Sequence, residues 1–225
     1  MAVVFIFING IVLLNVCQCV GLLLEGGTVE HIQLQQLRRA IDRIGSTYVR
    51  WGRHDCPAMN GTSLVYSGIA AGALFSTVGG GVNYLCLPHN PGSFLPANEI
   101  HPQQPYHQGS IYGAEYQFNY GNVHLDDDVP CAVCYVPAAV LMIPAKNSCP
   151  TSWLLQYSGI LTTNSDDFKS SSEFVCLDDN PQYIEGTRRN NDDGKLFYPV
   201  HAICGSLPCP PYVNNTYLRC CVCSK

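Results

Sequence analysis

Cysteine is the residue type in this sequence whose number and spacing most strongly suggest chemistry. The chain has 225 residues and 13 cysteines, several times ordinary usage. Cys131 with Cys134, and Cys220 with Cys223, have the Cys-x-x-Cys spacing of zinc half-sites and of redox-active pairs. In an oxidising compartment the same residues would form structural disulfides instead. The cellular compartment therefore decides what these residues do.

The amino-terminal segment indicates secretion. The stretch from Ala2 to Val16 is almost entirely apolar, and the first charged residue is Glu25. Such a stretch is short for a membrane span and is typical of a signal peptide. We expect a signal peptide over residues 1–21, cut within residues 19–21, so that Cys17 and Cys19 are lost and no membrane span remains. An uncleaved anchor is the alternative, because no Lys or Arg precedes the apolar run.

Two sequons agree with a eukaryotic secretory route. Asn60 is followed by Gly61 and Thr62, and Asn214 by Asn215 and Thr216. Both asparagines are candidate N-glycosylation sites on exposed loops.

An internal repeat organises the chain after about residue 48. Each half contains, in the same order, a Cys-Pro pair, a Tyr-Ser-Gly string, a Cys-Leu pair, an Asn-Pro pair and a terminal Cys-x-x-Cys. In the first half these begin at Cys56, Tyr66, Cys86, Asn90 and Cys131, and in the second at Cys149, Tyr157, Cys176, Asn180 and Cys220. The sequence therefore predicts two homologous subdomains over residues 48–138 and 139–225.

The repeat restricts how the eleven remaining cysteines pair. If each subdomain is self-contained, its four equivalent cysteines pair within it, which leaves Cys204 with Cys209 as an extra pair and Cys221 as the odd residue. We expect Cys221 to be either a buried unpaired thiol or the site of a bridge between chains. In an extended segment it points to the face opposite Cys220, and an outward thiol in an oxidising space would favour the bridge. Secretion and the matched upstream cysteines disfavour zinc, and Pro130 before one pair disfavours a redox helix.

The segment 28–45 is expected to form a short amphipathic helix. Leu34, Leu37, Ile41 and Ile44 recur at spacings of three and four with polar residues between them. This seam would serve either a coiled-coil stalk or packing on the chain's own domain, and the stalk predicts a homo-oligomer, with a trimer favoured. Beyond Gly45, short Val, Ile, Tyr and Phe runs between Gly, Pro, Asn and Asp clusters predict a β-rich domain.

Other candidate sites fit structural roles better than chemistry. His54, His101 and His107 could act as acids, bases or ligands, but no nucleophile or phosphate-binding motif accompanies them. Acidic pairs such as Asp126-Asp127 and Asp178-Asp179 could attract calcium, although turn formation explains them better. We therefore expect no catalytic, cofactor or metal site and no enzymatic activity.

The distribution of charge excludes one class of partner and suggests another. The net charge is −5, which argues against nucleic-acid binding. Arg38, Arg39, Arg43, Arg50 and Arg53 cluster near the start of the mature chain. They could form a solvated face with structural ion pairs, or meet the acid-rich half of another chain.

With these residues in view, the chain resembles the noncollagenous C-terminal domain of sponge-type short-chain (spongin-like) collagens. The resemblance covers residues 48–225 and rests on the strings that begin at Tyr48, Gly79, Ile111, Leu141 and Cys204: YVRWGR, GGGVNYLCLP, IYGAEY, LMIPAK and CGSLPCPPY. More distantly, the duplicated pattern is similar to the C-terminal noncollagenous domain of type IV collagen, which consists of two tandem β-rich subdomains and trimerises.

The resemblance implies a disulfide pattern, and the chain departs from the family at three points, one of which is that the first half lacks the small-loop cysteine pair. It implies five pairs: Cys56 with Cys134, Cys86 with Cys131, Cys149 with Cys223, Cys176 with Cys220, and Cys204 with Cys209. No Gly-X-Y repeat is present, so no collagen triple helix can form. Cys221 stands where the family usually has an apolar residue.

The expected fold is mainly β, with two tandem homologous disulfide-stapled β-rich subdomains preceded by a short amphipathic helix. The expected function is that of a secreted structural or assembly protein of the extracellular matrix or a surface coat. Its partners would be copies of itself, other matrix proteins or glycans. The alternative is a secreted, lectin-like protein that recognises glycans.

Overall fold

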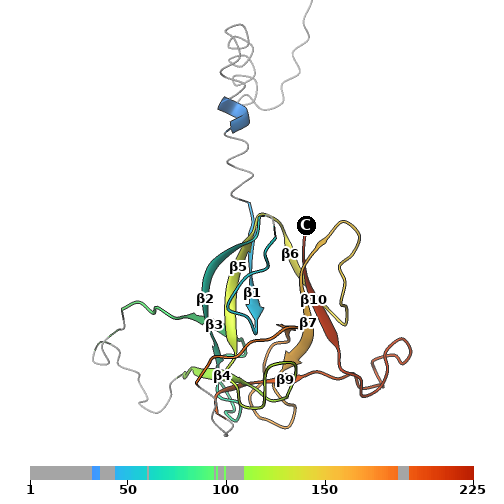
Figure 1. Ribbon diagram of the computed structural model, residues 1–225. Helices are drawn as coiled ribbons and strands as arrows, with labels where there is room; N and C mark the ends of the chain where they lie inside the picture. The colour runs from blue at the N-terminus through green and yellow to red at the C-terminus, as the bar shows by residue number, and fades with distance from the viewer. Residues whose placement is uncertain are drawn as a thin grey trace, which may run out of the picture. The chain divides into compact units, whose positions relative to one another are not determined.

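The computed structural model describes residues 32–35, 44–59, 61–93, 95, 99, 109–186 and 193–225. Residues 45–225 form one compact unit, described below by itself (Figure 1). The unit is mainly β, as expected, and its ten strands are β1 (Ser46–Trp51), β2 (Ser63–Gly72), β3 (Leu85–Pro88), β4 (Tyr112–Tyr116), β5 (Pro130–Val136), β6 (Val140–Pro144), β7 (Leu154–Thr163), β8 (Val175–Asp178), β9 (Lys195–Pro199) and β10 (Arg219–Ser224).

The expected amino-terminal elements lie mostly outside the described residues. The signal peptide at 1–21 is not among them, and of the expected helix at 28–45 residues 32–35 are helical. Within the described part of the chain, no helix has both the length and the apolar character needed to cross a membrane.

Strands β1–β5 and β6–β10 follow the same scheme of pairing. In the first set β1 pairs with β5, β5 with β2, and β2 with both β3 and β4. In the second set β6 pairs with β10, β10 with β7, and β7 with both β8 and β9. All eight of these pairings are antiparallel.

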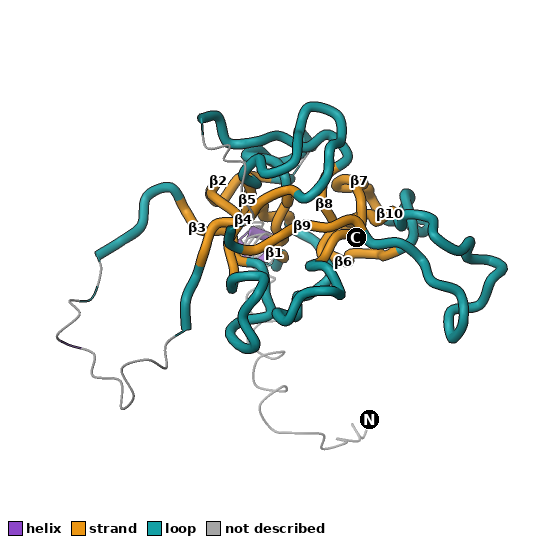
Figure 2. Tube along the Cα trace, turned by 90° about the horizontal axis from the view of Figure 1, so that it is seen from below, coloured by secondary structure: helices purple, strands orange, loops and turns teal. Residues whose placement is uncertain are grey.

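Two parallel pairings join the sets. Strand β1 meets β8 at Trp51 and Leu177, and β4 meets β9 from Ala114 with Lys195 to Tyr116 with Phe197. Because β9 also pairs with β7, the ladder closes into a circuit of β7, β8, β1, β5, β2, β4 and β9. In Figure 2 the strands of the first set gather on one side, β6, β7 and β10 lie on the other, and β9 runs between them.

The hydrophobic core is shared by both halves of the sequence. One cluster of buried residues brings Trp51, Tyr84 and Tyr116 against Leu177 and Phe197. The rings of Tyr84 and Phe197 have centroids 4.3 Å apart. Burial of large aromatic side chains contributes much of the stability of such a core, so neither half retains this core without the other.

Five disulfides staple the unit. Their pairs are the ones that the resemblance implies: Cys56–Cys134, Cys86–Cys131, Cys149–Cys223, Cys176–Cys220 and Cys204–Cys209. The first and third pairs span 78 and 74 residues and the second and fourth span 45 and 44. The matched spans follow from the matched strand pairings.

The repeated Tyr-Ser-Gly string has the same structural role in both halves. A Cβ on Gly68 would lie 2.0 Å from the Leu87 carbonyl oxygen, and a Cβ on Gly159 would lie 1.8 Å from that of Leu177. The hydroxyl of Tyr66 donates to the Cys86 carbonyl over 3.0 Å, and the hydroxyl of Tyr157 donates to the Cys176 carbonyl over 2.9 Å. Glycine thus allows close approach of the cysteine-bearing strand, and tyrosine fastens it.

Candidate interaction site at the junction of the two halves

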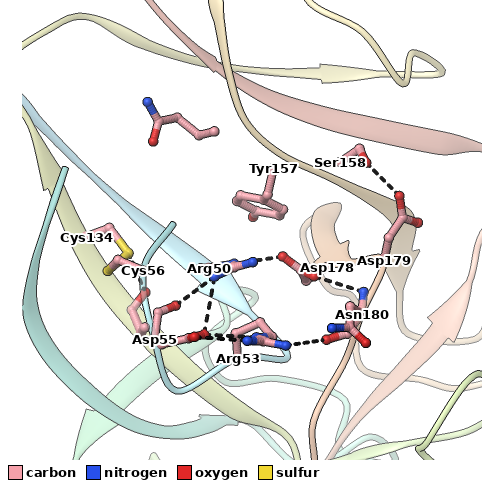
Figure 3. Close-up of polar contacts among 12 residues, drawn as sticks. Arg50, Arg53, Asp55, Cys56, Cys134, Tyr157, Ser158, Asp178, Asp179 and Asn180 are labelled. Atoms are coloured by element: carbon pink, nitrogen blue, oxygen red, sulfur yellow. Dashed lines mark hydrogen bonds and ion pairs between the residues drawn. A yellow bond between two sulfur atoms is a disulfide. The ribbon is translucent and has the colours of Figure 1, made fainter. Parts of the chain in front are cut away.

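The most concentrated set of charged contacts lies where β1 meets β8 (Figure 3). The Nε of Arg50 donates to Oδ2 of Asp178 over 2.7 Å. Its Nη1 donates to the backbone oxygen and to Oδ1 of Asp55, each over 3.2 Å. Arg50 therefore ties the end of β8 to the turn that follows β1.

A second arginine extends the network. The Nε and Nη2 of Arg53 donate to the two carboxylate oxygens of Asp55, each over 2.9 Å, and Nη1 donates to the Asn180 carbonyl over 3.0 Å. The hydrogen bonds from Arg53 hold the pKa of Asp55 below its ordinary value, and the same contact raises the pKa of Arg53. Both groups are therefore charged throughout the physiological range.

Burial separates the strong contact from the weaker ones. The Arg50 side chain is 13% exposed and that of Asp178 5%, whereas Asp55 is 48% exposed. Water screens the Asp55 contacts and leaves the Asp178 contact largely unscreened. The guanidinium also lies over the Tyr157 ring, 5.9 Å from its centroid. Arg50 with Asp178 is therefore the central interaction of the junction.

The backbone around the ion pairs is shaped to bring the two segments together. Gly52 has φ of +83°, and a Cβ there would lie 2.9 Å from a methyl carbon of Leu177. The Gly52 carbonyl accepts from the Gln182 backbone NH over 2.7 Å, and the Gln182 carbonyl accepts from the Tyr116 hydroxyl over 2.7 Å. Glycine is required here both by the left-handed conformation and by the close packing.

The end of β6 is equivalent in the repeat to the end of β1, where the junction lies. The strand registers align Trp51 with Pro144, since they lie opposite Cys131 and Cys220 respectively. Ala145 takes the place of Gly52, with φ of +58°. The Gly52 NH donates to the Pro130 carbonyl over 2.8 Å, and the Ala145 NH to the Arg219 carbonyl over 2.8 Å. The end of β6 thus reproduces the backbone of the end of β1.

Strands β3 and β6, the equivalents of β8 and β1, carry exposed leucines. All four residues of β8, which pairs with β1, are buried. On the equivalent strand β3, Leu85 is 49% and Leu87 37% exposed, and on β6, Leu141 is 47% exposed. Strand β3 pairs with β2 and strand β6 with β10, and within the described residues neither pairs with a further strand. The unit therefore carries two apolar strand edges whose equivalents meet inside the chain.

The sequence indicates the two arginines of this network but not their carboxylate partners. Arg50 and Arg53 form ion pairs within the chain, as the structural interpretation expects, whereas Arg38, Arg39 and Arg43 lie outside the described residues. A difference between the repeats could have revealed Asp178: Cys-Leu-Asp in the second half stands where the first half has Cys-Leu-Pro.

The other sequence-based candidates are dispersed. His54 borders a surface cavity of about 290 Å³ beside Arg53 and Gln182. Asn214 is exposed, and its Oδ1 accepts from the Cys204 NH over 2.9 Å. Asn60, His101 and His107 lie outside the described residues.

The acidic pairs take up structural positions. Oδ2 of Asp127 accepts from the His124 backbone NH over 2.7 Å, and Oδ1 of Asp126 accepts from the Gln117 amide over 3.1 Å. Asp126 has φ of +65°. These contacts belong to a turn. Across the described residues, the one group with metal-ligand spacing consists of Cys149, Cys221 and Cys223, two of which form a disulfide.

Cys221 is unpaired and buried, as the first of the two alternatives expects, so the outward orientation that favoured an interchain bridge is wrong. Its relative exposure is 0%, and its Sγ lies 3.4 Å from the Ser148 carbonyl oxygen. Alternation along β10 does separate it from Cys220, but the segment through Ser148 covers that face. Burial raises the pKa of the Cys221 thiol. An interchain bridge at Cys221 would therefore need this segment to move.

Compared with known proteins, the chain matches no family model and no curated protein sequence.

Proposed function

We propose that this chain is a secreted protein of the extracellular matrix or a surface coat, made of two homologous subdomains, that acts by assembling with copies of itself. The observation that carries this proposal is the pair of apolar strand edges on β3 and β6. Their equivalents, β8 and β1, meet within the chain at Leu177 and Trp51, and both of these residues are buried. Repetition of the same contact between chains would bury β3 of one copy against β6 of the next.

The side chains at the two edges suit such a contact. The registers align Arg50 with Ile143, and the repeat aligns Asp178 with Pro88, so the central ion pair would be replaced by an apolar contact. Burial of exposed leucines at this edge would contribute about 25 cal/mol for each Å² of apolar surface. Open strand edges are also sites where proteins associate unless they are protected.

A polar contact would flank the apolar one. Lys146 stands where the first half has Arg53, and Asn90 stands where the second half has Asn180. Arg53 donates to the Asn180 carbonyl within the chain. By the same geometry, Lys146 of one copy would donate to the Asn90 carbonyl of the next.

This contact uses different surfaces on the two copies, so it is heterologous and closes into a ring when the rotation allows. We propose a trimer, which the resemblance to the type IV collagen domain and the apolar seam at 28–45 both favour. The five disulfides support secretion, because such bridges persist in oxidising compartments.

The proposal is tested with mature protein purified from an oxidising secretory host. Size-exclusion chromatography with light scattering should show an oligomer for the wild type. Leu141→Lys and Leu87→Lys each place a charge on one edge and should yield monomers. The double variant Ile143→Arg/Pro88→Asp should remain oligomeric, because it places at the two edges the ion pair that joins Arg50 to Asp178 within the chain.

Ile203→Lys is the matched control. Ile203 is 57% exposed and lies outside the strands, so this variant should remain oligomeric. Near-ultraviolet circular dichroism verifies that each variant is folded. A wild-type monomer that binds defined sugars on a glycan array would contradict assembly and would favour the lectin-like alternative.

A further inference from the structure

Three sulfur atoms lie together beneath the segment that follows β6. The Sγ atoms of Cys149, Cys221 and Cys223 are all within 4.8 Å of one another. Cys149 and Cys223 form a disulfide, and the Cys221 Sγ lies 3.6 Å from the Cys223 Sγ. A free thiol therefore lies against an existing disulfide.

Local strand geometry creates this arrangement. Cys221 and Cys223 are two residues apart on β10, so their side chains share a face. The chain through Ser148 and Cys149 crosses that face, which explains the contact of the Cys221 Sγ with the Ser148 carbonyl. One cysteine from the crossing segment thus faces two on the strand.

The first half has no such thiol. Cys221 lies opposite Ser158, and in the equivalent register Ala132 lies opposite Ser67. Ala132 is buried beside the Cys56–Cys134 bridge in the position that Cys221 occupies beside Cys149–Cys223. The molecule therefore contains two equivalent bridges, one with a neighbouring thiol and one without.

We propose that Cys221 exchanges with the Cys149–Cys223 disulfide, so that Cys149 can bond to either of two positions on β10. The Cys221 thiol loses its proton to solvent, and its sulfur attacks the Cys149 Sγ. A Cys149–Cys221 bond forms, the Cys149–Cys223 bond breaks, and the released electron pair stays on the Cys223 Sγ, which takes up a proton. The step needs no oxidant or reductant.

Attack on Cys149 is favoured over attack on Cys223 by the reach of a disulfide. A bridge from Cys221 to Cys223 would join alternate residues of one extended strand, whose Cα atoms are about 6.7 Å apart. That separation is at the upper end of what a disulfide spans. Cys149 comes from the crossing segment and faces both strand positions.

Burial sets the conditions under which exchange occurs. Removal from water raises the pKa of the Cys221 thiol, and the nearby charge of Lys146 opposes this effect. The thiolate is the attacking species, so the rate should be low at mildly acidic pH and should rise as the pH increases.

The experiment uses the folded mature protein without reductant. Samples are held at about pH 6 and about pH 9, quenched with acid, unfolded, and labelled with N-ethylmaleimide. Peptide mapping without reduction, with fragmentation by electron transfer, then places the label on a single cysteine. The label should be on Cys221 at the lower pH, and a growing fraction, reaching at least a tenth of the protein, should appear on Cys223 at the higher pH.

Two variants test the role of the thiol, one by removing it and one by adding it to the first half. Cys221→Ala copies the first half, so the Cys149–Cys223 bridge should persist at both pH values with no labelled thiol. Ala132→Cys should give the first half the same exchange, with label appearing on Cys134. A wild-type label that stays on Cys221 at both pH values, or that appears on Cys149, would overturn the proposal.

Discussion

The substitution Asp178→Asn tests whether the buried ion pair holds the two halves together. Asparagine keeps an oxygen that can accept from the Asn180 backbone NH, a contact of 2.9 Å in the wild type. The substitution therefore removes the charge while leaving the shape and this hydrogen bond. Arg50, 13% exposed, would keep the half-exposed Asp55 as its one carboxylate partner, beside its contact with the Tyr157 ring.

The expected cost follows from the burial of the pair. Removing one partner of a fully buried ion pair destabilises a protein by about 3–5 kcal/mol. Because Arg50 keeps a second carboxylate at 3.2 Å, we expect a loss of about 2–4 kcal/mol. For a unit of this size, that corresponds to a fall of roughly 6–12 °C in melting temperature.

The assay is urea unfolding of the oxidised mature protein, followed by circular dichroism. Asp55→Asn is the control, and its half-exposed carboxylate should make it cost about 1 kcal/mol or less. A double-mutant cycle with Arg50→Met should give a coupling of about 2 kcal/mol between Arg50 and Asp178. If Asp178→Asn costs no more than Asp55→Asn and the coupling is near zero, the ion pair does not stabilise the junction.

Three further outcomes are expected. Gly159→Ala would place a Cβ 1.8 Å from a backbone carbonyl oxygen and should reduce the free energy of unfolding by about 3 kcal/mol or more in urea. Gly113→Ala, with nothing within 4 Å of the added Cβ, should leave it nearly unchanged. Burial raises the pKa of Glu115 from 4.5 to about 8, so the folded protein keeps a proton that the unfolded chain loses. Stability measured by urea titration should therefore fall as the pH rises through this range, by on the order of 2–4 kcal/mol, and Glu115→Gln should flatten the profile. Replacing both cysteines of the Cys204–Cys209 bridge, which spans 5 residues, should cost about 2 kcal/mol in thermal unfolding, against about 4 kcal/mol for a bridge that closes a long loop.

The β-rich class and the five disulfides were accessible from the sequence for different reasons. Turn residues between short apolar runs indicate strands locally. The repeat confined the cysteines to equivalent sets, and the resemblance supplied the pairs within each set. The Cys86–Cys131 and Cys176–Cys220 bridges span nearly equal lengths, 45 and 44 residues. The repeat could therefore show that these two bridges are equivalent.

The junction could not be predicted from local patterns. Parallel pairing of β4 with β9 joins strands from different halves and leaves no short-range signal. The partners Arg50 and Asp178 are 128 residues apart in sequence. Cys221 shows a related limit: strand alternation gives the direction of a side chain, but which segment covers that face depends on tertiary structure.

The pairing of β1 with β8 has a consequence for the order in which the protein is made. A ribosome releases β1 long before β8, so the first half emerges with the outer edge of β1 unpaired. Contacts this distant in sequence slow folding, and an unpaired edge attracts other strands. Nascent chains would therefore depend on chaperones until residue 178 has emerged, and truncation between the two halves should produce aggregation rather than a smaller folded domain.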